Sequence, residues 1–322
     1  MQPVVLSDDA SALRQLGFAH LERVWTDELP RAAFELWDGL AEAREVLWRP
    51  VFARPAERCD ESRSAPEAGP LLVAREVGFS QFERLAAWAR EGSVPPDGLA
   101  CVALAGSRFR GQRGRPWTAL PGNLHLATHL TLDLDAAATQ AGLSLLPSVA
   151  VARAIERVSD GRVRPGLKWV NDLLVGGRKV GGVLSATQVQ GGRALHLVVG
   201  VGVNVARAPD LPPSSRALPA GALAGADPVF ADEGAWARLL PAVRAELAQA
   251  RDQLRRGGST TLLEPYRERA AFLGRHVTIW PVEDEAGPPI ARGRVLALND
   301  DLSLELEGVA APVRRGRMTL DP

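Results

Sequence analysis

The chain has 322 residues, 46% of them hydrophobic and 24% charged, and its 38 basic and 38 acidic side chains give a formal net charge of zero. This composition is typical of a globular protein with one large and one or two small domains, and its neutrality argues against a general affinity for nucleic acid. Apolar runs of membrane-spanning length, a secretory leader and metal-type or disulfide-type cysteine spacing are all missing, so we expect a cytoplasmic protein without a membrane partner.

The first seventy residues differ in texture from the rest. Leu13–Leu21 and Ala32–Leu47 carry apolar residues at helical spacing, and the polar, proline-rich segment Pro55–Pro70 is typical of a linker. We therefore predict an N-terminal helical extension over residues 1–70, of unknown role. Because it has no helix-turn-helix pattern and no basic face, we expect no DNA partner.

From Leu71 onward, helical and strand patterns alternate. The predicted helices are Gly78–Gly92, Leu143–Val158, Ala235–Arg256 and Thr260–Ala271. The predicted strand segments are Leu99–Ala105, Asn123–Leu132, Leu167–Val175 (with a turn), Lys179–Thr187 and Leu195–Val205, and Pro209–Pro228 is expected to be an irregular loop. Four short strands with Gly, Pro and Asp turns then predict a small SH3-like β-barrel: His276–Pro281, Ala291–Ala297, Ser303–Leu306 and Met318–Leu320.

A single loop, Ala105–Asn123 (AGSRFRGQRGRPWTALPGN), concentrates arginine and glycine. Its residues of interest are Arg108, Arg110, Arg113, Arg115, Gly106, Gly111, Gly114 and Trp117. Arginine forms paired hydrogen bonds to phosphate or carboxylate, glycine lets main-chain N–H groups approach an anion, and an indole offers a surface for a base. The loop therefore predicts a lid over a nucleotide phosphoester.

Two further motifs follow. Lys168–Ser185 (KWVNDLLVGGRKVGGVLS) places Lys168, Asn171 and Asp172 at a strand end and Lys179 on the returning strand, a set suited to a metal, a ribose and an acyl phosphate. The alternative is an ordinary hairpin whose Arg-Lys pair is simply solvated. Gly200–Asn204 (GVGVN) allows close approach of a ligand, but it lacks the third glycine and the helix of a dinucleotide fingerprint.

The order and separation of these three motifs resemble the biotin protein ligase family, within the wider biotin/lipoate protein ligase group. The resemblance runs from about Leu71 to Leu320. It implies an α+β fold with a mixed sheet flanked by helices, similar to class II synthetases, over 71–272, and an SH3-like domain over 273–322. It also implies an enzyme that converts biotin and ATP, with Mg²⁺, into an acyl-adenylate and pyrophosphate, and then passes the biotinyl group to a lysine of a biotin carboxyl-carrier domain with release of AMP. A homodimer is the expected assembly.

The resemblance assigns roles residue by residue. Lys179 and Arg110 are the implied catalytic residues. The implied acid-binding residues are Ser80, Gln81, Gly106, Arg110, Gly111, Gln112, Gly114, Lys179, Gly182 and Gly200. The implied nucleotide-binding residues are Arg110, Arg113, Arg115, Trp117, Asn171, Asp172 and Asn204, with Trp117 stacking on adenine, Asn204 contacting its edge, and Asn171 and Asp172 also serving the metal.

The chain departs from the family pattern at several of these positions. Gly106 stands where the family usually has glutamine, Phe109 where it has glycine and Gln112 where it has arginine; Val170 and Ala186 replace a proline and a glutamate. The first three changes fall at the acid pocket and the loop. Two alternatives are therefore weighed beside biotin ligation: the same chemistry on lipoate, octanoate or another small acid, and a non-catalytic protein that binds biotin or a nucleotide.

Overall fold

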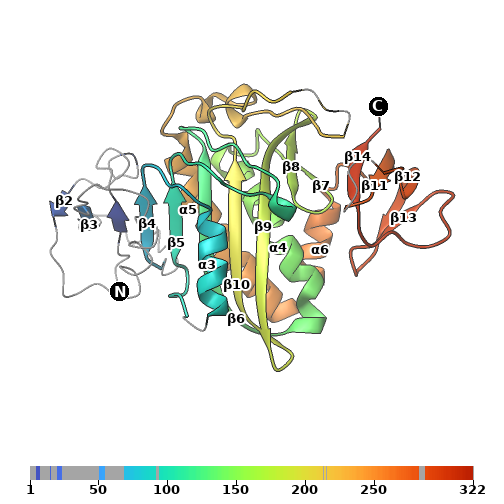
Figure 1. The fold of residues 1–322 in the computed structure, drawn as a ribbon, viewed down its shortest axis with the longest axis horizontal. Helices are drawn as coiled ribbons and strands as arrows, with labels where there is room; N and C mark the ends of the chain where they lie inside the picture. The colour runs from blue at the N-terminus through green and yellow to red at the C-terminus, as the bar shows by residue number, and fades with distance from the viewer. Residues whose placement is uncertain are drawn as a thin grey trace.

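The computed structural model describes residues 69–321 apart from 92–93, 213, 215 and 283–286, together with residues 5–7, 15, 20–23 and 51–54. Most of these residues form one large mixed sheet with helices on both faces (Figure 1). The sheet has the strand order β2-β3-β1-β4-β5-β6-β10-β9-β8-β7, in which β1–β4 and β4–β5 are parallel pairs and the other neighbours are antiparallel.

The strands of this sheet are β1 (Val5–Ser7), β2 (His20–Arg23), β3 (Val51–Arg54), β4 (Leu71–Ala74), β5 (Ala100–Ala103), β6 (Leu124–Asp135), β7 (Gly166–Lys168), β8 (Asp172–Val175), β9 (Arg178–Gln190) and β10 (Arg193–Val203). The central pair, β6 and β10, is long and nearly all buried. A strand buried on both faces needs apolar residues at successive positions, which is why Leu195–Val205 has almost no polar alternation.

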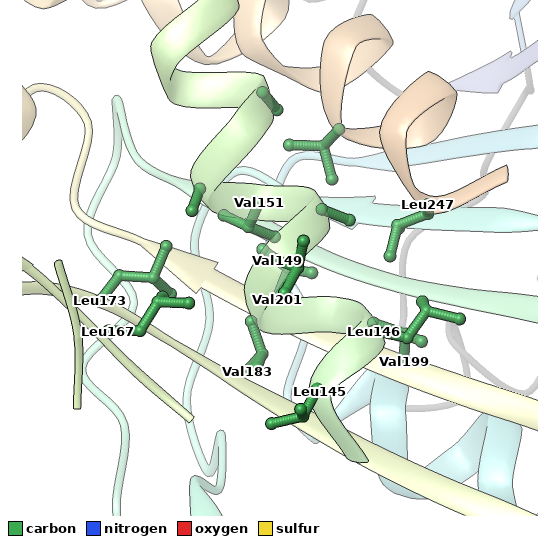
Figure 2. Close-up of a cluster of buried hydrophobic side chains, with 14 of the residues drawn as sticks. Leu145, Leu146, Val149, Val151, Leu167, Leu173, Val183, Val199, Val201 and Leu247 are labelled. Carbon is green, nitrogen blue, oxygen red and sulfur yellow. The ribbon is translucent and has the colours of Figure 1, made fainter. Parts of the chain in front are cut away.

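Helix α3 (Gln81–Arg90) covers one face of the sheet, and α4 (Ala136–Val158), α5 (Ala235–Gly257) and α6 (Thr260–Arg267) cover the other (Figure 1). Alternate residues of β10 enter two different cores: Val198 packs with Leu85 of α3, and Val199 packs on the α4 side. Figure 2 shows Val199 and Val201 among the buried side chains of α4 and its neighbours. Burial of each such side chain contributes about 1.5–3 kcal/mol, so this core fixes the sheet beneath the site.

A separate antiparallel sheet follows, with the order β13-β12-β11-β14. Its strands are β11 (His276–Trp280), β12 (Ala291–Leu298), β13 (Leu304–Leu306) and β14 (Arg317–Leu320). It lies at the β7 end of the molecule, far from β2 and β3 (Figure 1). The indole N–H of Trp169 donates to the Leu302 carbonyl at 2.9 Å and joins this sheet to the larger one.

The predicted α+β architecture is confirmed, with a mixed sheet, flanking helices and a small antiparallel sheet at the end. Of the helix predicted over Leu13–Leu21, the structure describes Gln15, which is helical, and His20 and Leu21, which lie in β2 and show that the predicted helix extends too far. The segment Ala32–Leu47 and Cys59 lie outside the described residues. Strands β1 to β3 instead lengthen the main sheet, so the described parts of residues 1–70 belong largely to a sheet rather than to a helical extension. In the described part of the chain, the helices are too short or too polar to cross a bilayer.

Candidate active site

A row of four paired residues forms the floor of the site. Across strands β8, β9, β10 and β6, Asp172 lies opposite Gly182, Gly182 opposite Gly202, and Gly202 opposite His125. Residues directly opposite one another in antiparallel strands carry their side chains on the same face. The two glycines therefore leave a flat strip of backbone between the carboxylate and the imidazole. A Cβ on Gly202 would lie 2.6 Å from the ring of Trp117, so this position needs glycine.

A β-bulge turns Lys179 toward this face. The pairing of β8 with β9 shifts between Leu173 and Leu174, and Val180 and Val183, three residues apart, both point into the α4-side core. Without the shift, alternation would send Val180 and Val183 to opposite faces. The Lys179 ammonium instead reaches Asp172 Oδ1 at 2.6 Å.

Asp172 lies between two lysines. Its Oδ2 contacts the Lys168 ammonium at 2.7 Å, while its Oδ1 contacts Lys179. Burial by itself would raise the pKa of the Asp172 carboxyl, but the charges of Lys168 and Lys179 outweigh it and hold that pKa well below the usual range. The carboxylate is therefore ionised at neutral pH and fixes Lys179 in place. This pairing excludes the simple solvated hairpin as an account of Lys179.

The arginine loop is a closed turn. Trp117 N–H donates to the Phe109 carbonyl at 2.9 Å, and Gly111 N–H donates to the Arg115 carbonyl at 2.7 Å. Inside the turn, Arg110 Nη1 donates to the Gly114 carbonyl at 3.1 Å. The Phe109 side chain is buried beneath the turn, whereas Arg110 is exposed.

A cavity of about 520 Å³ lies between this loop, the glycine floor and the start of α3. Predicted site residues that line it are Ser80, Gln81, Arg110, Gly111, Gln112, Arg115, Trp117, Asn171, Lys179, Gly182, Gly200 and Asn204. Residues from five separate segments of the sequence thus converge on one space, which is the size of a small-molecule site.

A second cavity of about 180 Å³ adjoins the first on the side of the small sheet. Gln112, Arg115, Asn171 and Lys179 line both cavities. Further cations that line the second are Arg113, Lys168, Arg216 and Arg317, with Asp172 as its carboxylate. This excess of positive charge makes the second cavity suited to an anion.

Gly106 and Gly114, two of the predicted acid-binding residues, line neither cavity. A Cβ on Gly106 would lie 2.6 Å from both the Phe109 ring and the Val77 carbonyl, so Gly106 serves packing beneath the loop. Gly114 has φ +71° and open space around it, so it serves the turn. Arg113 and Asp172 lie in the second cavity rather than the first.

The residues predicted to hold a metal do not fit a metal-ligand set. Both Asp172 oxygens contact ammonium groups, and Asn171 Nδ2 donates to the Val183 carbonyl at 2.8 Å. Within the residues that the structure describes, no three His, Cys, Asp or Glu side chains gather as metal ligands. The assignment of Mg²⁺ to Asn171 and Asp172 is therefore not supported by their contacts.

Asn204 is buried at the edge of the first cavity. Its amide nitrogen donates to the Gly221 carbonyl at 3.0 Å, while its Oδ1 has no hydrogen-bond partner among the described residues. A buried acceptor without a partner is costly, which points to a donor that the ligand supplies.

The sequence analysis missed three contributors. His125 is 2% exposed and lines the cavity, and its place beside Gly202 would have followed from pairing β6 with β10. Phe82 covers Gly200, whose Cβ would lie 3.0 Å from its ring. The third contributor lies in Pro209–Pro228, which was expected only to be an irregular loop. Lys179 N–H donates to the Pro219 carbonyl and Gly221 N–H donates to the Lys179 carbonyl, and Leu211 lines the cavity. The proline-rich sequence of this segment carries no signal for such a role.

Comparison with known proteins identifies the family of the chain. The profile of the biotin/lipoate A/B protein ligase family matches residues 90–204. The biotin--[acetyl-CoA-carboxylase] ligase of Paracoccus denitrificans is 30% identical over 216 residues, which cover 64% of this chain and 84% of that protein. The chain belongs to the biotin/lipoate A/B protein ligase family.

Other members of the biotin/lipoate ligase family match over shorter stretches or more weakly. The bifunctional ligase/repressor BirA of Salmonella typhimurium is 37% identical over 110 residues, which cover 34% of this chain and only 33% of that protein. The biotin protein ligase of Aquifex aeolicus, solved in complex with biotin and ATP, shares the fold with a TM-score of 0.59 at 22% identity, covering 78% of this chain and 98% of that one.

Proposed function

We propose that this protein is an ATP-dependent biotin ligase that acts on a lysine of a biotin carboxyl-carrier domain. In the first step, a carboxylate oxygen of biotin attacks the α-phosphorus of ATP, and pyrophosphate leaves. In the second step, the lysine ε-amine attacks the acyl carbon of the mixed anhydride, AMP leaves with the bonding electrons, and the amine loses a proton. Family membership and the biotin ligase names of the relatives support biotin as the acid.

The observation that carries the proposal is the position of Lys179. Its ammonium is held by Asp172 and borders both cavities, while Arg110 and Arg115 line the first cavity from the loop. Negative charge on the carboxylate and the α-phosphate would thus meet three cations. Fixed charges of this kind stabilise the transition state because they need no reorganisation. A protein nucleophile is not required, since the acid itself attacks.

The two cavities suit the two parts of the nucleotide. The Oδ1 of Asn204, which has no partner among the residues that the structure describes, can accept a hydrogen bond from the exocyclic amine of adenine, and Trp117 borders the same cavity as a stacking surface. The second cavity, lined by Arg113, Arg216 and other cations, can take the pyrophosphate. Both carboxylate oxygens of Asp172 contact lysine ammonium groups, so Asp172 is not available as a metal ligand and the two proposed steps depend on the cationic side chains.

The proposal extends to the domain boundary, the location and the assembly of the protein. We place the boundary between the catalytic and the SH3-like domain near residue 272, supported by the start of the separate sheet at His276. The requirement for ATP and for a carrier domain supports a cytoplasmic location. Homodimer formation and the lack of a DNA partner stay predictions.

Transfer to a carrier domain tests the proposal. The full chain is incubated with ATP, biotin and a biotin carboxyl-carrier domain, and the intact mass of the carrier is measured. We expect one biotinyl group on the acceptor lysine, and none on a carrier whose acceptor lysine is replaced by arginine. A carrier that stays unmodified although the protein is folded, as judged by circular dichroism, would contradict the proposal.

A further inference from the structure

Within the arginine loop (Ala105–Asn123), the turn from Phe109 to Trp117 begins and ends with an aromatic residue, and both contact His125. The edge-to-face contact of Phe109 with His125 has a centroid distance of 5.7 Å and an interplanar angle of 79°. The indole N–H of Trp117 donates to His125 Nδ1 at 3.4 Å. Because the backbone N–H of Trp117 donates to the Phe109 carbonyl, these two residues are also joined to each other where they contact His125.

His125 is itself firmly held. It is 2% exposed on β6, and its Nε2 lies 3.4 Å from the Leu120 carbonyl. Its own carbonyl accepts a hydrogen bond from Gln81 Nε2 at 3.3 Å, which ties it to the start of α3 in the cavity wall. His125 therefore joins the loop to two other segments that surround the cavity.

One protonation state satisfies all of these contacts. Nδ1 must be unprotonated to accept from the Trp117 indole, so the proton lies on Nε2, where it can be donated to the Leu120 carbonyl. Burial lowers the pKa of the His125 imidazole to about 4, and the bond to Leu120 opposes this only in part. The imidazole is thus a neutral acceptor at working pH.

These contacts hold the turn from Phe109 to Trp117 against β6. Between Phe109 and Trp117, the exposed residues Arg110 and Arg113 border the first and the second cavity, and the contacts at His125 are made by the two ends of this turn. The Trp117 ring sits directly over Gly202, opposite His125 in the sheet register, so any sideways movement of the indole would break both contacts.

We propose that His125 is a positioning residue that holds the arginine loop over the cavity. It does so by accepting the hydrogen bond of the Trp117 indole N–H and by packing against Phe109. These contacts keep Arg110 and Arg115 at the cavity, so that less of the binding energy of the substrate is needed to order the loop. This inference rests on the proposed function only for its consequence in catalysis; the state of the loop is independent of it.

Limited proteolysis of the ligand-free protein tests the inference without any substrate. Trypsin can cut after Arg110 and Arg113, and mass spectrometry reports cleavage there relative to cleavage after Arg178, the first residue of β9. His125→Leu keeps an apolar side chain but removes the acceptor. We expect His125→Leu to increase the rate of cleavage in the loop about fivefold, which is the change in an equilibrium constant that corresponds to the free energy of one neutral hydrogen bond. His125→Asn offers an amide oxygen near the place of Nδ1 and should restore most of the protection.

The matched control is His129, a second buried histidine on β6. It contacts Pro96 and His196 and does not line the cavity. His129→Leu should leave the loop as resistant as in the unaltered protein. The inference is overturned if His125→Leu stays resistant, if His125→Asn is as labile as His125→Leu, or if His129→Leu exposes the loop equally.

A kinetic measurement links the loop to the reaction. In biotin-dependent ATP–pyrophosphate exchange, His125→Leu should raise KM for ATP about fivefold while kcat changes little, because part of the binding energy must then order the loop. An unchanged KM would contradict the proposed role in placing the arginines. Protected loops in a protein that supports no exchange would instead overturn the proposed function and leave the loop inference standing.

Discussion

At the scale of single residues, the site depends on one carboxylate that serves two lysines. The Asp172 carboxylate holds Lys179 beside the cavity through one oxygen and forms a second ion pair, with Lys168, through the other. With two cations on one anion, the group carries a net positive charge toward the ligand. A residue pair of one cation and one anion would be neutral and would attract a phosphate less strongly.

Removal of Lys179 tests this charge arrangement. Lys179→Ala should lower the rate of biotin-dependent pyrophosphate exchange by about 100-fold or more, the usual cost of deleting one group that stabilises transition-state charge. The fold should be unchanged by circular dichroism. Arg193→Ala is the matched control, because Arg193 is an exposed cation at the far end of β10, paired with Asp133. Wild-type exchange in Lys179→Ala would show that Lys179 has been assigned the wrong role.

The residues that line the first cavity were largely predictable from motif order, while their contacts were not. Lys179, Asn171 and Arg110 were identified from sequence and lie together. The double ion pair of Asp172 depends on a β-bulge that no local pattern marks. His125 looked like an ordinary position of an alternating strand, because its importance comes from Trp117 and Phe109, whose approach to it is a tertiary contact.

At the scale of elements, the helices under the sheet pack closely enough to need small residues. Gly142 of α4 lies where α5 crosses, and a Cβ there would be 2.4 Å from Leu254 Cδ1 and 3.1 Å from Ser259. The sequence pattern located α4 but placed its start at Leu143, seven residues late. Asp135 begins the helix by accepting the Ala138 N–H at 2.8 Å, and the alanine-rich first turns have too few large apolar residues to show helical spacing.

Gly142→Val tests this crossing. The extra atoms have no space, so the free energy of unfolding should fall by about 1–3 kcal/mol in urea titration. Ala138→Val, at an exposed position of the same helix, should cost only about 0.5 kcal/mol through helix propensity. Equal effects of the two substitutions would contradict tight packing at Gly142.

At the scale of the whole molecule, buried histidines couple folding to pH. Burial lowers the pKa of His125 from 6.5 to about 4 and also lowers that of His129. Between pH 6.5 and pH 4 the unfolded chain binds a proton that folded His125 does not, so the contribution of His125 to stability is fully present above about pH 6.5 and is lost as the pH falls toward 4.

Unfolding at two pH values tests this coupling. The His125 contribution predicts a loss of about 2 kcal/mol in the free energy of unfolding between pH 7 and pH 5. His125→Asn should lose less over the same range, since it removes the titrating group and leaves only His129 and the other ionisable groups. An identical pH dependence in the two proteins would show that folding leaves the pKa of His125 unchanged.

The whole-molecule arrangement was predictable in outline only. Helical and strand periodicity gave the mixed sheet, its helices and the terminal small sheet, because the apolar pattern of each element matches its burial. The sequence did not predict that strands β1, β2 and β3 belong to the same sheet. These strands are only three or four residues long, and they lie in a segment whose dominant spacing of apolar residues is helical.

Acid-dependent exchange of labelled pyrophosphate into ATP tests the central claim most directly, because it reports acyl-adenylate formation without a carrier protein. The full chain is assayed with biotin, lipoate, octanoate and no acid. We predict exchange with biotin and background rates with the other three. Exchange with lipoate or octanoate but not with biotin would contradict biotin as the substrate, and background exchange with every acid would contradict an adenylating enzyme.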